Sequence, residues 1–261
     1  MPRFSANLGL LWADLPLLER VERAARAGFR AVELQFPYDT PAREVGQACR
    51  RLGLTLLNIN APPGGPADGA SGLAALPGRE QAFREAMEQA IAWCRESGAR
   101  GIHAMAGTVP AERRGEAAEV LVGNLRHAAA EAECHGLTVL VEAINRRDKP
   151  DYFYATQAES HGILQRVGAG NLRMLFDVYH VGVSEGDVLT RLERYLPWIG
   201  HVQIAAVPSR AEPDEGEIRY EAVFQALDRL GYAGWVGCEY RPRAGVEAGL
   251  GWRQALAPGA G

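Results

Sequence analysis

The chain has 261 residues, of which 47% are hydrophobic and 23% charged, and its formal net charge at pH 7 is −4. This length suits two small domains or one α/β barrel, because such barrels run to roughly 250 residues as a single domain. Proteins that bind nucleic acid usually carry a basic excess, so the acidic balance argues against a nucleic-acid partner.

The sequence shows no signal for a membrane or for secretion. No apolar run approaches the ~20 residues that a membrane-spanning helix needs, and the first residues lack the apolar core and cleavage site of a signal peptide. The four cysteines lie far apart and form no C-x-x-C pair; they are Cys49, Cys94, Cys134 and Cys238. We therefore expect a cytoplasmic protein with reduced thiols and no membrane partner.

Short apolar runs alternate with longer amphipathic runs along the whole chain. The apolar runs predict eight strands, at Phe4–Leu10, Ala31–Phe36, Thr55–Asn60, Gly101–Gly107, Thr138–Ile144, Leu172–His180, Ile199–Ala205 and Trp235–Tyr240. The runs between them have the apolar spacing of helices. Strand–helix alternation indicates a parallel sheet, and no strand is followed by the G-x-G-x-x-G loop of a doubly wound dinucleotide-binding sheet. We predict an α/β fold, a (β/α)₈ barrel, with residues 1–261 forming one domain and the tail after Leu256 frayed.

The predicted helices have recognisable start and stop signals. Thr156 and Glu159 have the spacing of a capping box ahead of an apolar helical run. Glycine follows several helical stretches, where it most easily adopts the left-handed conformation that ends a helix; these are Gly53, Gly98, Gly136 and Gly231. We expect the Gly- and Pro-rich stretch Ala61–Gly78 to be a long loop after the third strand.

Polar side chains stand near the C-terminal ends of the last four predicted strands. They are Glu142, Asp177, Gln203 and Glu239. One acidic residue at a strand end is usually a helix cap or a salt-bridge partner. Four polar residues on consecutive strands meet at the mouth of a barrel, where active sites lie, and their charges repel unless a cation is present. Because the set offers only oxygen ligands, we predict one divalent cation, Mg²⁺ or Mn²⁺, rather than zinc.

The same loops carry three further candidates. His180 follows Asp177 by three residues, Arg210 lies in the loop after the seventh strand, and Asp148 lies six residues past Glu142. Taken singly, a loop arginine is usually solvated and a lone histidine usually structural, so their position on these loops is what favours a functional role. His180 is also open to interpretation as a fifth cation ligand.

Other polar residues in the strands have no assigned role at this stage. Glu33 lies in the second strand, where a role in the pocket and a buried ion pair are both open. His103 and His201 lie in strands but show no evident spacing that joins them to the acidic set.

Several ordered stretches of the chain resemble the hydroxypyruvate isomerase family, a branch of the sugar isomerase/epimerase barrels that are similar to xylose isomerase. They are RFSANL, FPYD, PGRE, FDVYH, GHVQIA, EPDEGEI and GWVGCEY, from Arg3 to about Trp252. The resemblance implies a (β/α)₈ barrel with one divalent metal held by the positions of Glu142, Asp177, Gln203 and Glu239. It implies that Glu142 and Glu239 transfer protons, and that Asp148, His180 and Arg210 hold the oxygens of the substrate.

The sequence departs from the family pattern around the pocket. The usual H-N-L-P-A-G after the third strand is replaced by L-N-I-N-A-P at Leu57–Pro62, and Ala206 and Val207 replace an Asp-Asn pair after the seventh strand. Ala143 stands where I-E-P-I-N usually has proline. The cation set is intact while the pocket wall differs, so the departures bear on the identity of the substrate and not on the isomerase chemistry.

These observations predict an isomerase that interconverts hydroxypyruvate and tartronate semialdehyde, or a related oxo-tetronate, through a cis-enediolate. The main alternative is a ketose 3-epimerase acting on neutral sugars. An apurinic endonuclease would need a histidine-rich zinc cluster and a basic face for DNA, and a non-catalytic sugar-binding protein would be expected to lose one of the two glutamates. The expected partner is a small hydroxy-keto acid or sugar, and the oligomeric state stays open, a homo-oligomer included.

Overall fold

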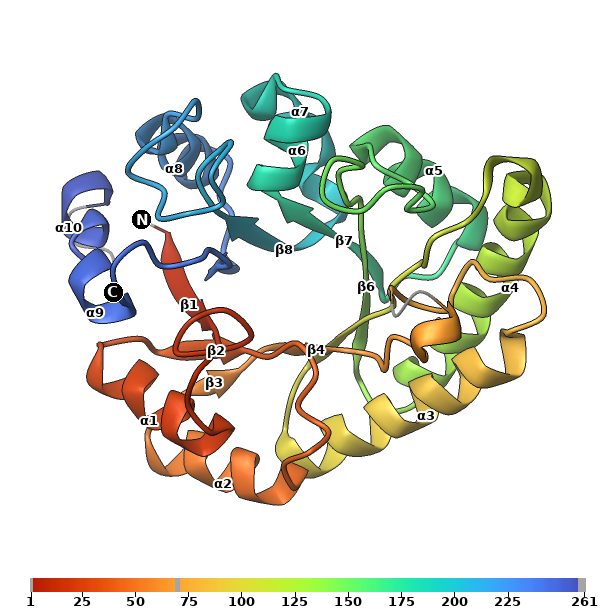
Figure 1. Cartoon of the computed structure of the whole chain (residues 1–261), viewed down its shortest axis with the longest axis horizontal. Helices are drawn as coiled ribbons and strands as arrows, with labels where there is room; N and C mark the ends of the chain where they lie inside the picture. The colour runs from red at the N-terminus through yellow and green to blue at the C-terminus, as the bar shows by residue number, and fades with distance from the viewer. Residues whose placement is uncertain (1, 69–70, 258–261) are drawn as a thin grey trace.

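Parallel strands form the inner wall of the molecule and helices surround them (Figure 1). The computed structural model describes residues 2–68 and 71–257. The strands are β1 (Arg3–Asn7), β2 (Ala31–Glu33), β3 (Thr55–Leu56), β4 (Asn58–Asn60), β5 (Gly101–His103), β6 (Thr138–Glu142), β7 (Leu172–Asp177), β8 (Ile199–Ile204) and β9 (Trp235–Cys238). Their order in the sheet is β3-β2-β1-β9-β8-β7-β6-β5-β4.

The helices lie on the outside of this wall (Figure 1). They are α1 (Leu17–Arg26), α2 (Ala42–Arg51), α3 (Glu80–Ser97), α4 (Arg114–Glu133), α5 (Gln157–Val167), α6 (Val178–Ser184), α7 (Val188–Tyr195), α8 (Tyr220–Arg229), α9 (Val246–Gly249) and α10 (Trp252–Leu256). Three short 3₁₀ turns complete the described part of the chain, at Pro66–Asp68, Ala111–Arg113 and Leu196–Trp198.

The two ends of the sheet meet at Leu57, which separates β3 from β4. β3 pairs with β2, while β4 pairs with β5. The Leu57 N–H donates to the Val32 carbonyl at 2.9 Å, and the Leu57 carbonyl accepts from the Gly101 N–H at 3.0 Å. β3 and β4 are therefore two parts of one strand that closes the ring, and the predicted eight-stranded barrel is confirmed.

The predicted strands extend too far at their C-terminal ends. The run Gly101–Gly107 is a strand only to His103, and the run Leu172–His180 is a strand only to Asp177, after which α6 begins. Ala104 and Ala106 follow β5 with no exposed surface. A buried loop and a buried strand both read as apolar runs, so the sequence pattern alone does not separate them.

Helix ends agree with the predicted signals. The Thr156 side chain accepts from the Glu159 N–H while the Glu159 carboxylate accepts from the Thr156 N–H at 3.0 Å, a complete capping box at the start of α5. Gly98 ends α3 with φ of 88°, a left-handed conformation that residues with a Cβ rarely adopt. Of the tail predicted to fray after Leu256, residues 258–261 lie outside the described residues.

Apolar side chains fill the space between the strands and the helices, while the C-terminal end of the barrel interior is polar. Phe4, Ile59 and Ile102 are completely buried in the apolar layer. Within the described residues, no helix is both long and apolar enough to cross a membrane. The four cysteines are all free.

Candidate active site

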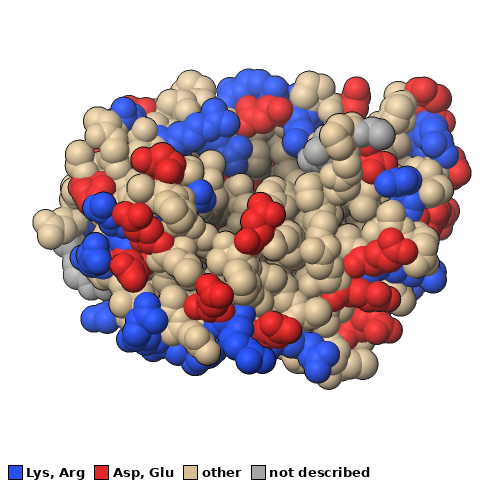
Figure 2. All heavy atoms as spheres, turned by 60° about the horizontal axis from the view of Figure 1, so that its bottom comes forward, with Lys and Arg blue, Asp and Glu red and all other residues tan. Residues whose placement is uncertain are grey.

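A cavity of about 470 Å³ opens at the C-terminal end of the barrel, where the strand-end residues lie. Glu142, His180, Arg210 and Glu239 line it, and the loops that follow β6 and β8 form part of its wall. Figure 2 shows a face of the molecule with a hollow near its middle and with acidic and basic residues interspersed around it. The location is where α/β barrels carry their active sites.

Three of the predicted cation ligands lie at the ends of strands that are next to each other. Glu142 ends β6, Asp177 ends β7, and Gln203 lies in β8 as the register partner of Asp177. Each of the three is at least nine-tenths buried. Within the described residues, Glu142 Oε1, Asp177 Oδ2 and Gln203 Oε1 are buried without a hydrogen bond. A buried acceptor that lacks a hydrogen bond lowers the stability of the fold. A hard divalent cation would provide a partner for all three oxygens, because such cations prefer oxygen ligands.

Asp177 uses its two carboxylate oxygens differently. Oδ1 accepts the Tyr179 N–H at 2.9 Å and so caps the start of α6, while Oδ2 is left toward the site. The residue is therefore both a helix cap, the usual role of such an aspartate, and a candidate ligand.

The carboxylates carry a strong mutual repulsion. Burial raises the pKa of Asp177 to about 7, and the nearby negative charge of Glu239 adds to the effect. Burial also raises the pKa of Glu142 well above its usual value, with further contributions from Glu239 and Asp177. A cation bound among these groups would hold them ionised, because it favours the charged form.

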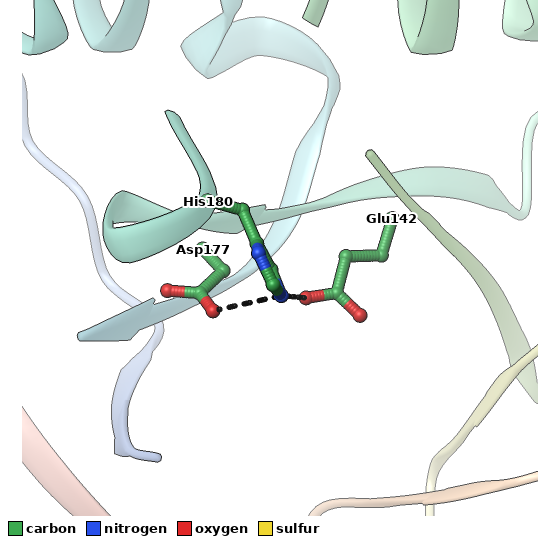
Figure 3. Close-up of side chains that lie close together, drawn as sticks. All are labelled: Glu142, Asp177 and His180. Carbon is green, nitrogen blue, oxygen red and sulfur yellow. Dashed lines mark ion pairs between the residues drawn. The ribbon is translucent and has the colours of Figure 1, made fainter. Parts of the chain in front are cut away.

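Glu142, Asp177 and His180 form a compact group with ligand atoms within 4.8 Å of one another. Figure 3 shows the His180 ring standing between the two carboxylates. His180 Nε2 lies 3.7 Å from Glu142 Oε1 and 3.6 Å from Asp177 Oδ2. Burial lowers the pKa of His180 to about 3, so the imidazole is neutral at physiological pH.

The hydrogen bonds of Asn145 decide which nitrogen of His180 carries the proton. The Asp148 N–H donates to Asn145 Oδ1 at 2.8 Å, so the amide nitrogen Nδ2 faces His180 Nδ1, 2.6 Å away. Nδ1 must then accept, and in a neutral imidazole the proton is on Nε2. His180 thus presents an N–H donor to the site, which suits the predicted contact with a substrate oxygen better than a role as fifth ligand.

Glu239 lies one residue beyond β9 and differs from the other three candidate ligands. Its Oε1 accepts from Asn7 at 3.1 Å and from Gln35 at 3.0 Å. Its Oε2 accepts from the Arg210 guanidinium at 2.9 Å. Both oxygens of Glu239 are therefore hydrogen-bonded, whereas each of the other three residues has an unpaired oxygen.

Arg210 reaches into the cavity from the loop after β8. Its backbone has φ of 57°, and its guanidinium lies 4.9 Å from the centre of the Tyr179 ring. Its Nη1 lies 3.6 Å from Asp148 Oδ2, and its Nε is buried without a hydrogen bond inside the described part of the chain. Although burial works against it, the three carboxylates nearby, Glu239 above all, raise the pKa of Arg210. Arg210 is therefore permanently charged, and its Nε–H is a hydrogen-bond donor that has no partner among the described residues.

Asp148 is held at the edge of the cavity by two donors. Its Oδ2 accepts from the Tyr179 hydroxyl at 2.7 Å and from Asn145 Nδ2 at 3.3 Å. Asp148 and His180 thus share Asn145, and Asp148 and Arg210 share Tyr179. The structure brings all three predicted substrate-binding residues to one side of the cavity.

Comparison with known proteins assigns this barrel to a family. The family described as xylose isomerase-like TIM barrel matches residues 21–257. The chain belongs to this family. It is 48% identical over 253 residues to a 2-oxo-tetronate isomerase of Cupriavidus necator, covering 97% of each chain. It is 39% identical over 255 residues to a hydroxypyruvate isomerase of Escherichia coli, covering 97% of this chain and 98% of that protein.

A solved structure agrees with this assignment. A protein of Brucella melitensis described as AP endonuclease, family 2, superposes with a TM-score of 0.94 at 42% identity, covering 98% of this chain and 99% of that one. The curated relatives carry isomerase names, so the predicted family and the isomerase class are confirmed for this xylose isomerase-like barrel.

Sequence reasoning missed several residues of the site in this xylose isomerase-like barrel. His103 and His201 each lie against a buried carboxylate, although no spacing in the sequence joined them to the acidic set. His103 Nδ1 lies 3.5 Å from Glu142 Oε2, and burial lowers the pKa of His103 to about 4. His201 Nε2 lies 2.5 Å from Glu33 Oε2. His201 stands two residues before Gln203 in β8, so the period-two alternation of strands was the available signal.

Proposed function

We propose that this xylose isomerase-like barrel is a divalent-cation-dependent isomerase of short 2-oxo acids that carry a hydroxyl beside the carbonyl. Hydroxypyruvate and the four-carbon 2-oxo-tetronate both have this arrangement, and relatives of the chain are named for each. The observation that supports the proposal most is the set of three unpaired buried oxygens, on Glu142, Asp177 and Gln203. It lies beside a cavity that Glu142, His180 and Arg210 line.

Glu142, Asp177 and Gln203 would hold the cation through their unpaired oxygens, and Glu239 would complete the set through a carboxylate that now pairs with Arg210. When bound, Mg²⁺ or Mn²⁺ supplies Lewis acidity that polarises the carbonyl of the substrate and makes the neighbouring C–H more acidic.

Proton transfer falls to the two glutamates. One removes the proton from the hydroxyl-bearing carbon and gives a cis-enediolate, and the other returns a proton to the former carbonyl carbon. The hydroxyl proton passes from its original oxygen, which becomes the new carbonyl oxygen, to the former carbonyl oxygen. For hydroxypyruvate the product is tartronate semialdehyde. Glu142 and Glu239 come from opposite ends of the C-terminal half of the barrel wall, on β6 and after β9.

Positive charge around the cavity favours an acid over a neutral sugar. Arg147, Lys149, Arg210 and Arg241 line the cavity. A guanidinium donates in a planar fork that matches a carboxylate, and Arg210 has an unpaired Nε for such a contact. The Nε2–H of His180 and the Arg210 guanidinium would stabilise negative charge that develops on the enediolate oxygens. Asp148 would accept from a substrate hydroxyl.

The test is a substrate panel with the chelated protein, before and after Mg²⁺ or Mn²⁺ is restored. Hydroxypyruvate, 2-oxo-tetronate and a neutral ketose are each incubated in D₂O, and NMR follows deuterium entering the substrate carbon skeleton. We expect cation-dependent exchange and isomerisation of at least one acid. Preference for the neutral ketose would instead indicate a 3-epimerase, and no exchange with any compound would contradict the proposal.

The single-domain assignment of residues 1–261 and the cytoplasmic location stay predictions.

A further inference from the structure

Glu33 is a fully buried carboxylate at the end of β2 that the chemistry above does not use. It is 1% exposed. Its Oε1 accepts from Asn7 Nδ2 at 2.9 Å and from Gln203 Nε2 at 2.7 Å. Its Oε2 accepts from the Ser5 hydroxyl at 3.1 Å and lies 2.5 Å from His201 Nε2. Each carboxylate oxygen therefore has two partners, one from β1 and one from β8.

Strand β9, which is separated from β2 by β1 in the sheet, leaves space for this carboxylate. Gly237 lies in β9, and a Cβ at this position would stand 2.5 Å from Glu33 Oε2 and 2.6 Å from Oε1. Real side chains do not approach that closely, so the Glu33 carboxylate occupies the space that a side chain at Gly237 would fill.

The hydrogen bond from Gln203 to Glu33 determines which end of the Gln203 amide faces the cavity. A carboxylate only accepts, so the amide nitrogen of Gln203 must point at Glu33. The carbonyl oxygen Oε1 is then the end left over, and it is one of the three unpaired oxygens of the site.

Asn7 connects Glu33 to Glu239, a second candidate ligand, through hydrogen bonds. The Gly9 N–H donates to Asn7 Oδ1 at 3.0 Å, which fixes the orientation of the Asn7 amide. Asn7 Nδ2 therefore lies between two carboxylates, donating to Glu33 Oε1 at 2.9 Å and to Glu239 Oε1 at 3.1 Å. Glu33 thus contacts one candidate ligand directly and a second through Asn7.

We propose that Glu33 is a positioning residue of the cation site, which holds the Gln203 amide with its oxygen toward the cation and, through Asn7, anchors the Glu239 carboxylate. A buried ion pair with His201 alone would need only Oε2, and it would not account for the two donors on Oε1. This inference rests on the cation dependence proposed above. Residues behind metal ligands commonly control their orientation, and their loss costs roughly 10–100-fold in metal affinity.

A reciprocal exchange of amide and carboxylate tests the contact. In Gln203→Glu two carboxylates would face each other across the short contact, so we expect Mn²⁺ affinity to fall by roughly 10–100-fold, although a carboxylate is the stronger ligand for a hard cation. In the double variant Glu33→Gln with Gln203→Glu, the amide introduced in β2 can donate to the new carboxylate. Its nitrogen also faces the Asn7 Nδ2 donor, so the recovery is partial. We expect this variant to recover Mn²⁺ affinity by about tenfold relative to Gln203→Glu.

Affinity is measured by titration calorimetry and by the electron paramagnetic resonance signal of free Mn²⁺, and folding by circular dichroism in chelator. The matched control combines Gln203→Glu with Glu212→Gln. Glu212 is also completely buried, and it pairs with Arg243 at 2.9 Å rather than with the site. Because the Glu212 charge lies away from the site, its removal should not restore the Mn²⁺ affinity that Gln203→Glu loses.

Each outcome decides the inference. The inference is supported if Mn²⁺ affinity recovers in the reciprocal variant and does not recover in the control variant. Mn²⁺ affinity in Gln203→Glu equal to or above that of the wild type, or no recovery in the reciprocal variant, overturns it while leaving cation dependence intact. If Gln203→Glu does not fold, refolding of the reciprocal variant but not of the control is the supporting result, and failure of both overturns it. A wild type that binds no Mn²⁺ overturns both the inference and the cation dependence.

Discussion

Arg210 and Glu239 form a close ion pair inside the cavity, at 2.9 Å, and the pair links the cation site to the substrate site. Glu239 is a candidate ligand and proton carrier, while Arg210 is the candidate partner of the substrate carboxylate. Because Arg210 retains an unpaired Nε, it can contact an acid without first leaving Glu239. The guanidinium that would bind the substrate therefore also limits how far Glu239 is free to move.

Replacing either glutamate by glutamine separates proton transfer from ligation. Glu142→Gln and Glu239→Gln keep an oxygen but cannot exchange a proton at neutral pH, so turnover should fall by roughly 10²–10⁴-fold. Steady-state kinetics at rising Mn²⁺ concentration measures the effect, with Glu212→Gln as a control for loss of a buried carboxylate. Restoration of most of the rate by excess Mn²⁺ would show that the two residues act only as ligands.

Replacing Arg210 distinguishes an acid substrate from a neutral one. Arg210→Ala should raise KM strongly for 2-oxo acids and much less for neutral ketoses, with a loss of about 2–4 kcal/mol if the charge pair is desolvated. Kinetics on both substrate classes and Mn²⁺ affinity are compared with Arg113→Ala, whose guanidinium is exposed on the surface and pairs with Glu116. Equal losses for both classes would mean that Arg210 orders its loop instead of binding the carboxylate.

Strands of this barrel do more than carry the side chains at their ends, because they also shape the space into which side chains of other strands extend across the barrel interior. β9 contributes Gly237, opposite the Glu33 carboxylate of β2. β8 contributes His201 and Gln203 to the barrel interior on alternate residues, and both contact Glu33. Strands from the two ends of the chain thus build one buried carboxylate pocket.

The packing of β9 against Glu33 can be tested at Gly237. Gly237→Ala should displace the Glu33 carboxylate from its four partners and destabilise the fold by roughly 1–3 kcal/mol, the usual cost of overpacking. Chemical denaturation measures this cost. The control is Gly101→Ala in β5, where a Cβ would make ordinary contacts of 3.4 Å with Asn58 and 3.6 Å with Leu140. Equal stability losses at the two glycines would contradict a specific role for the space at Gly237.

Closure of the barrel brings the carboxylates of Glu142, Asp177 and Glu239 together. Their repulsion lowers the free energy of unfolding of the whole molecule. In the unfolded chain Asp177 has its ordinary pKa of 3.8, while folding raises the pKa to about 7. The folded state therefore holds protons more tightly than the unfolded state between these values, and stability falls as pH rises through that window. Glu142, whose pKa folding also raises, contributes in the same direction.

The cation-free protein should therefore lose thermal stability between about pH 4 and pH 7. Added Mn²⁺ should restore more stability at the upper end of the window, because it binds the folded state and needs ionised ligands. Melting temperatures in chelator and in Mn²⁺ across this range test the prediction. Asp177→Asn serves as the comparison, since it should flatten the pH dependence in chelator. An unchanged slope in that variant would show that another group is responsible.

The architecture and the strand-end oxygens of the site could be predicted from the sequence alone. Alternating apolar and amphipathic runs specify strands and helices locally, and parallel strands bring their C-terminal ends to one edge whatever the detailed packing. Glu142, Asp177 and Gln203 were therefore readable as neighbours from their places in β6, β7 and β8. The capping box of Thr156 and Glu159 was readable for a similar reason, because its two residues lie within one turn.

The ends of the strands and the pairing of polar groups, in contrast, depend on how the chain packs in three dimensions. Apolar loop residues such as Ala104 and Ala106 are buried like strand residues, so their pattern hid the end of β5. Asn7 and Glu239 are 232 residues apart, and Gln203 and Glu33 are 170 apart. Local periodicity carries no information on such contacts, because they depend on barrel closure and on which donor reaches a buried acceptor. The roles of Glu33 and of the His180 proton follow from those contacts and not from spacing along the chain.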